Sequence, residues 1–144
     1  MTFTDFLNNK FIWVPVSIWL IIQLWKFVFD IIKNKKVNLK RLIGAGGMPS
    51  SHSAVVSSLA TLIGKSEGVG SPIFALSCIF ALVVMYDATG VRRAAGKQAR
   101  ILNQIINSKE VKVNVTEKLV EFLGHTPFEV FVGFILGIGY ALLF

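Results

Sequence analysis

A long apolar run near the N-terminus constrains this chain more than any other feature. Residues 11–32 are almost entirely hydrophobic. At about 1.5 Å of rise per residue, a helix of this length crosses the hydrocarbon core of a bilayer, which is about 30 Å thick. The run is too long for the apolar segment of a signal peptide, and neither a basic start nor a small-residue cleavage site accompanies it. We therefore expect a membrane-spanning helix that remains in the protein.

Further apolar blocks follow at residues 50–64, 72–90 and 127–144. Hydrophobic residues make up 53% of the 144-residue chain and charged residues only 16%, a pattern typical of proteins whose solvent is partly lipid. The sequence thus predicts a single all-α membrane domain over residues 1–144. It would be a polytopic bundle of about four spanning helices with short interfacial helices, one of them near residues 116–122. Close helix packing in the last block is favoured by Gly133, Gly137 and Gly139.

The distribution of positive charge predicts the orientation in the membrane. Twelve of the fifteen Lys and Arg residues fall within residues 33–41 and 92–118, and such residues concentrate in cytoplasmic loops. We expect segments 33–49 and 91–126 to be cytoplasmic in an integral protein of the plasma membrane. The net charge of +7 then reflects orientation and contact with anionic lipid. No basic stripe interleaved with aromatic residues indicates nucleic acid as a partner.

Three polar clusters fall on the expected cytoplasmic side. They surround His52, residues 87–97 and His125, and the chain has no other histidine. Each histidine stands at the entrance of a predicted spanning helix, close to glycine, hydroxyl side chains and proline. Ionisable residues at membrane depth are costly and mark functional sites. We therefore expect the three clusters to form one site.

These side chains suit the hydrolysis of a phosphate monoester. One histidine would attack phosphorus to form a phosphohistidine, while the other would protonate the leaving alkoxide. Glu129, four residues after His125, can orient an imidazole by a hydrogen bond. Cations and the start of a helix would bind the phosphoryl oxygens. The candidates are Arg92, Arg93 and Lys97, together with Ser50, Ser51 and Ser53.

Three motifs support this chemistry by resemblance. They are GMPSSHSA at residues 47–54, YDATGVRRAAGKQ at 86–98 and GHTPFEV at 124–130. Together and in this order they resemble the divergent branch of the type 2 phosphatidic acid phosphatases, membrane proteins related to acid phosphatases and vanadium haloperoxidases. The resemblance implies that His52 is the general acid, His125 the nucleophile and Glu129 its orienting carboxylate.

The chain also departs from the family pattern. Ser51 stands where the family has glycine, Glu129 where it has aspartate, and no Ser-Arg pair directly precedes His125. The first family motif, a lysine spaced ahead of Arg-Pro, has no clear match. Lys40 or Arg41 would have to replace its lysine.

Two classes of protein therefore stay open. The first is an integral membrane phosphatase that hydrolyses a lipid phosphate monoester at the cytoplasmic interface, without a cofactor or an obligatory metal. The second is a non-catalytic membrane protein that binds phosphorylated lipids or partner membrane proteins on a degenerate phosphatase scaffold. A divalent metal is a third, weaker possibility, because two histidines with Asp87 and Glu129 supply suitable ligand types. Four short spans enclose little volume, which favours a homodimer.

Several of these residues also have simpler local roles. Lys26 and Asp30, four residues apart, can pair at the membrane edge. Asp87 can pair with Arg92 or Lys97. The serines before the second apolar block can cap its helix, and residues 126–129 predict a capping box with proline at the first helical position.

Overall fold

The structure is a computed structural model that describes residues 3–35, 37, 46–106, 119 and 123–144. Over these ranges the chain is helical and contains no strand, which confirms the all-α prediction for the described part. The helices are α1 (Phe3–Leu7), α2 (Lys10–Asn34), α3 (Ser51–Glu67), α4 (Pro72–Thr89), α5 (Val91–Ile106) and α6 (Pro127–Ala141). Lys40 and Arg41 lie outside the described residues, as does the helix predicted at 116–122 apart from residue 119.

Two helical stretches are long and apolar enough to cross a membrane. One is α2, with 25 residues, and the other is the run of α4 and α5 from Pro72 to Ile106, with 35 residues. The remaining two predicted spans correspond to α3 with 17 residues and α6 with 15. Both are shorter than the roughly 20 residues that a typical spanning helix needs. The structure therefore supports two spans by length and composition, and does not confirm four.

Residues at the helix ends explain where the helices begin. Ser50 caps α3, since its Oγ accepts a hydrogen bond from the Ser53 amide, and Ser71 caps α4 in the same way ahead of Pro72. Thr126 and Glu129 form the predicted capping box of α6. Side-chain oxygens at these positions satisfy amides that have no partner within the helix.

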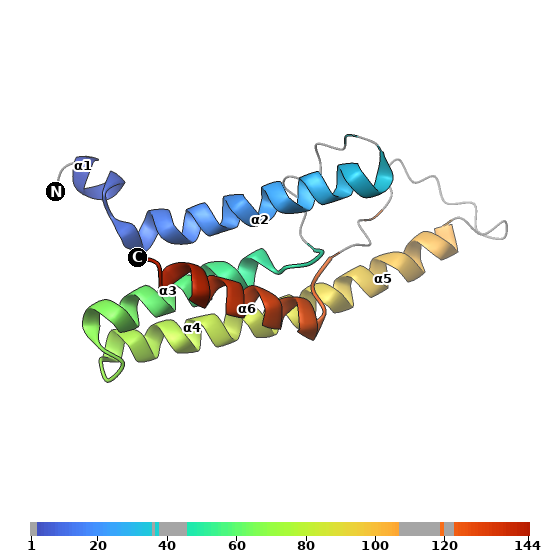
Figure 1. Ribbon diagram of the computed structural model, residues 1–144. Helices are drawn as coiled ribbons and strands as arrows, with labels where there is room; N and C mark the ends of the chain where they lie inside the picture. The colour runs from blue at the N-terminus through green and yellow to red at the C-terminus, as the bar shows by residue number, and fades with distance from the viewer. Residues whose placement is uncertain (1–2, 36, 38–45, 107–118, 120–122) are drawn as a thin grey trace.

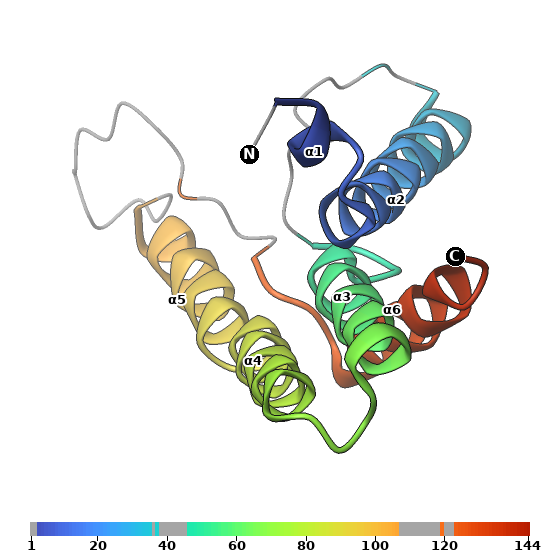
Figure 2. The same ribbon diagram turned by 90° about the vertical axis from the view of Figure 1, so that its left-hand side faces the viewer.

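Helix α3 lies at the centre of the bundle, where it packs against α2, α4 and α6 (Figures 1 and 2). Glycines of α6 permit the close approach to α3. A Cβ on Gly137 would lie 2.8 Å from the Ala54 Cα, and one on Gly133 would lie 3.1 Å from the Ser50 carbonyl carbon. Gly139 has no neighbour within 4 Å of such a Cβ, so the prediction that it serves close packing is wrong.

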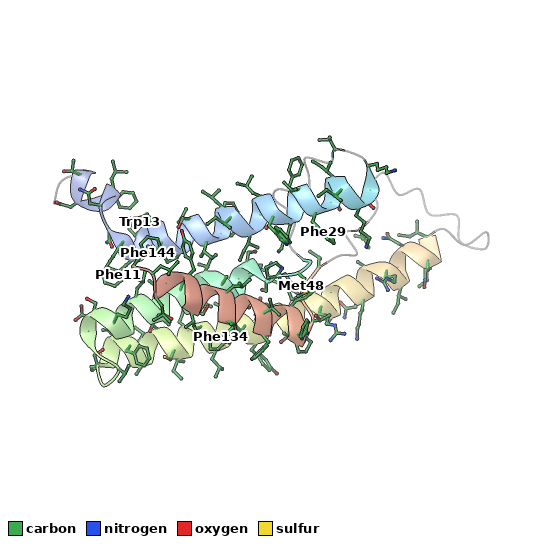
Figure 3. All side chains as sticks on the ribbon, in the orientation of Figure 1. Phe11, Trp13, Phe29, Met48, Phe134 and Phe144 are labelled. Carbon is green, nitrogen blue, oxygen red and sulfur yellow. The ribbon has the colours of Figure 1, made fainter. Side chains whose placement is uncertain are left out.

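The ends of five helices lie toward one end of the bundle. Figure 1 shows the starts of α3 and α6 there, with the last turns of α2 and the junction of α4 and α5. At the opposite end, the chain terminus returns to the start of α2, where the Trp13 and Phe144 ring centroids lie 4.9 Å apart (Figure 3). The polar motifs are thereby gathered at one end only.

Candidate functional site

The start of α3 is fixed against the first turn of α6. The Ser50 amide donates a hydrogen bond to the Glu129 carbonyl oxygen at 3.0 Å. Ser50, Ser51 and Ser53 are buried, with exposed fractions of 0%, 6% and 0%. Their burial agrees with a structural role at the helix start. The Ser53 Oγ has no hydrogen-bond partner within the described residues.

The loop before α6 is fixed against the junction of α4 and α5. The His125 amide donates to the Ala88 carbonyl oxygen at 2.9 Å. Gly124 has a φ of +81°, and a Cβ there would lie 2.6 Å from the Arg93 Cα. Because both the backbone conformation and the available space require glycine, this residue sets the position of His125 relative to α5.

These two attachments bring His52 and His125 together. Their ring centroids lie 5.6 Å apart, with an interplanar angle of 67°. His125 is only 1% exposed, and its Nδ1 lies 3.5 Å from Glu129 Oε2. The same carboxylate oxygen accepts a hydrogen bond from the Thr126 amide at 2.8 Å. Glu129 thus caps α6, and its carboxylate also lies within ion-pair distance of the imidazole, although no hydrogen bond joins it to His125 Nδ1 in the described part of the chain.

The environment of His125 favours the neutral imidazole. Burial is the main reason that its pKa is lowered from 6.5 to about 4, and the positive charges of Lys26 and of a protonated His52 act in the same direction. The carboxylate of Glu129 opposes the shift. At pH 7 the ring is therefore uncharged, and one of its two nitrogens carries a lone pair.

A basic cavity of about 370 Å³ opens beside His125. Arg93, Lys97 and Arg100 line it from one face of α5, at a spacing of four and three residues. The opposite wall is formed by backbone and side chains of the two loops and of α6, namely Gly46, Gly47, Leu123, Gly124, His125, Thr126 and Glu129. The cavity thus combines cations with glycine-rich backbone next to an imidazole.

Arg92 lies outside this cavity lining. Its Nε donates to Asp87 Oδ2 at 3.0 Å, and both side chains are nearly half exposed. The simpler role expected for Asp87, pairing with Arg92, is thus confirmed. Although the two arginines are adjacent in sequence, only Arg93 lines the cavity, because consecutive helical residues face different directions.

Lys26 is a further site residue that the sequence interpretation placed at the membrane edge. It is 7% exposed, its charge acts on His125, and it lines a cavity of about 220 Å³ that shares Gly46 and Gly47 with the basic cavity. The sequence feature that could have indicated this role is the presence of a lysine within an apolar helix. Arg100 was not among the cations expected to bind phosphate, although its spacing from Arg93 and Lys97 places it on the same helix face.

No group of three or more His, Cys, Asp or Glu side chains in the described part of the chain is arranged to hold a metal ion. Asp87, which was considered as a ligand with the histidines, instead pairs with Arg92. The donor atoms near His125 that the structure describes are mainly cationic groups and amides, which suit an anion.

The fold and the site define an all-helical protein with apolar helices of membrane-spanning length and a histidine pair beside a basic cavity. The model of the divergent PAP2 family matches residues 7–140, and the chain belongs to this family, as the motifs indicated. It is also similar to the uncharacterized membrane protein YuiD of Bacillus subtilis (strain 168), with 40% identity over 128 residues and 81% of each chain covered. No solved structure matches the chain.

Proposed function

We propose that this protein is an integral membrane phosphatase that hydrolyses lipid phosphate monoesters through a phosphohistidine intermediate. One observation carries the proposal: a buried histidine lines a basic cavity while a second histidine lies 5.6 Å from it, ring centre to ring centre. Membership of the divergent PAP2 family supports a phosphatase-related scaffold. A lipid substrate suits the apolar α2 and α4–α5 helices and the similarity to a membrane protein.

His125 would act as the nucleophile. Its Nδ1 faces the carboxylate of Glu129, which favours the tautomer with the proton on Nδ1 and the lone pair on Nε2. As Nε2 forms a bond to phosphorus, the bond from phosphorus to the lipid alkoxide breaks. The lowered pKa of His125 keeps the attacking nitrogen unprotonated at neutral pH.

His52 would supply and recover the proton. It donates a proton to the departing alkoxide, which leaves as an alcohol. Water then attacks the phosphohistidine, its proton passes to His52, and the phosphorus–nitrogen bond breaks to release inorganic phosphate. Each histidine ends the cycle in the state in which it began it.

Cations would neutralise the phosphoryl oxygens during both steps. Arg93 and Lys97 line the cavity from α5, and Lys26 adds positive charge from α2. Fixed cations contribute most where the charge of the transition state is spread over equatorial oxygens. We assign no step to a metal ion.

The proposal includes the membrane setting expected from the sequence. The four predicted spans would correspond to α2, α3, α4 and α6 in a single domain. The described parts of the two basic segments include residues 33–35 and 46–49 of the first and residues 91–106 and 123–126 of the second, and both adjoin the histidine end of the bundle. This end would therefore face the cytoplasm at the plasma membrane. The short α3 and α6 would span more fully when the bilayer thins locally or two copies associate.

The test is release of phosphate from vesicles of a long-chain diacylglycerol phosphate by the purified protein. We expect His125→Ala and His52→Ala each to lower the rate by about 100-fold or more. Arg93→Ala should also lower it, whereas Lys65→Ala is the matched control. Lys65 is a cation at the other end of α3, and its Nζ donates to the Leu142 carbonyl oxygen.

Each outcome separates one class of protein from another. Activity that survives both histidine substitutions refutes the mechanism. Binding of the vesicles without turnover by the wild-type protein identifies the non-catalytic alternative, in which the scaffold binds phosphorylated lipid. Activity that disappears with a chelator and returns with a divalent cation identifies a metal-dependent hydrolase.

A further inference from the structure

An apolar groove of about 610 Å³ runs between α2 and α6. Its lining on α2 follows helical spacing and forms one face of that helix. The lining residues are Ile18, Ile21, Ile22, Trp25 and Phe29 from α2, Val132 and Leu136 from α6, and Met48 and Pro49 from the connection before α3. All of these side chains are apolar, so the groove suits an apolar ligand.

One end of this groove adjoins the small cavity that contains Lys26, which in turn adjoins the basic cavity. Phe29 and Met48 line both the groove and the small cavity that contains Lys26. Gly46 and Gly47 line that small cavity and also the basic cavity beside His125. In Figure 3, Phe29 and Met48 lie toward the histidine end of the bundle. A ligand in the groove would therefore have its polar end near the cations.

The length of the groove matches one leaflet of a bilayer. From Ile18 to Phe29 there are eleven helical steps of about 1.5 Å, or about 16 Å along α2. This is about half of the roughly 30 Å hydrocarbon core. An acyl chain whose headgroup lies at the membrane surface occupies the same depth.

A second apolar groove provides an internal comparison. It measures about 500 Å³, lies between α3, α4 and α6, and includes Thr61, Phe74 and Ile138 in its lining. Neither groove shares a lining residue directly with the basic cavity, but this second groove also shares none with the small cavity that contains Lys26, and the cation in its own lining is Lys65. Apolar character is common to both grooves, whereas residues shared with the small cavity that contains Lys26 distinguish the first.

We infer that the groove between α2 and α6 binds an acyl chain of the lipid whose phosphate enters the basic cavity. This inference rests on the proposed function and adds the path of the substrate. The lipid enters sideways from the bilayer between α2 and α6, and the residues of the groove determine which chains are accepted. Val132, which lies one helical turn from Glu129 on α6, is the lining residue best placed to control that entry.

The test uses the full chain in vesicles that contain a diacylglycerol phosphate with a photoreactive diazirine in the middle of one acyl chain. Illumination followed by peptide mass spectrometry maps the labelled residues without requiring turnover. We expect adducts on α2 residues 18–29 and on α6 residues 132–136. Excess unlabelled diacylglycerol phosphate should remove these adducts, whereas phosphatidylcholine should not.

Two matched variants on α6 sharpen the test. Val132→Trp should lower the competed labelling of the first groove by about tenfold, equivalent to about 1.4 kcal/mol. Ile138→Trp, which fills the other groove, should leave this labelling unchanged. The inference is overturned if wild-type labelling is not competed by unlabelled diacylglycerol phosphate, or if it falls equally on both grooves. Because this result comes from the wild-type protein, it does not depend on whether a variant folds.

The outcomes for substrate path and for catalysis are distinguishable. Competed labelling of the α2–α6 groove without phosphate release supports the groove and refutes the phosphatase. Phosphate release without competed labelling of the groove refutes the groove and leaves the phosphatase standing.

Discussion

Because Gly133 packs closely against the start of α3, we expect the single methyl group added by Gly133→Ala to destabilise the fold. A Cβ at this position would lie 3.1 Å from the Ser50 carbonyl carbon, and the carbonyl oxygen would be closer still. Ordinary contacts begin at 3.4 Å, so the two backbones must separate by at least several tenths of an ångström. Gly133→Ala should therefore lower the free energy of unfolding by about 1–3 kcal/mol, as overpacked cores do.

The same separation should affect the site. The hydrogen bond from the Ser50 amide to the Glu129 carbonyl oxygen joins the helix starts that carry the two histidines. Since Gly133 lies one turn beyond Glu129, moving α6 away from α3 lengthens the distance between His52 and His125. We expect a loss of phosphate release that exceeds the loss of folded protein.

Gly139→Ala is the matched control on the same helix. No atom lies within 4 Å of its added Cβ, and alanine favours helix over glycine by roughly 1 kcal/mol. This variant should be as stable as the wild type or more stable. Denaturant titration in micelles measures the stability, and vesicle assays measure the activity. Equal stability of the two alanine variants would refute the packing argument.

Three further predictions concern the site and its orientation. In the pH profile of kcat/KM, the acid limb should follow the pKa of His125 at about 4, because protonation removes the attacking lone pair. Glu129→Gln should move that limb to lower pH, since the carboxylate raises this pKa; an unchanged limb contradicts the assignment. Gly124→Ala and Gly68→Ala share a φ of +81°, but only the first meets neighbouring backbone, so circular dichroism melts should show the larger destabilisation for Gly124→Ala. Lys35→Cys, without the native cysteine, should react with an impermeant thiol reagent only from the cytoplasmic side, and labelling only from outside would invert the topology.

Local signals explain how much of the fold could be predicted. Pro72 and Pro127 follow capping hydroxyl residues and start α4 and α6 where the apolar blocks begin. Interactions within one helical turn determine such starts, so the sequence is sufficient for them. The number of membrane-spanning helices is harder to predict, because for short helices such as α3 and α6 it depends on the local bilayer thickness and on how the helices pack against each other.

In the site, too, the sequence predicts local interactions but not those that depend on helix packing. Asp87 pairs with Arg92, which is only five residues away. The sequence predicted this pair as one of two possibilities, the other being a pair with Lys97. For Lys26, the sequence offers Asp30 as a local partner four residues away and gives no sign of a distant neighbour such as His125. Its position near His125 depends on the rotation of α2 about its own axis, a property that no local pattern specifies.

By itself, the sequence determined that the chain is helical and apolar, that its histidines stand at helix starts and that Glu129 caps α6. These features follow from composition and from contacts within one turn. Only the tertiary structure decided that Arg93 lines the cavity while Arg92 faces Asp87, and that Gly133 and Gly137 meet α3 while Gly139 does not. Neighbouring helical positions differ by about 100° in direction, so the packing of helices against one another selects among residues that the sequence makes equivalent.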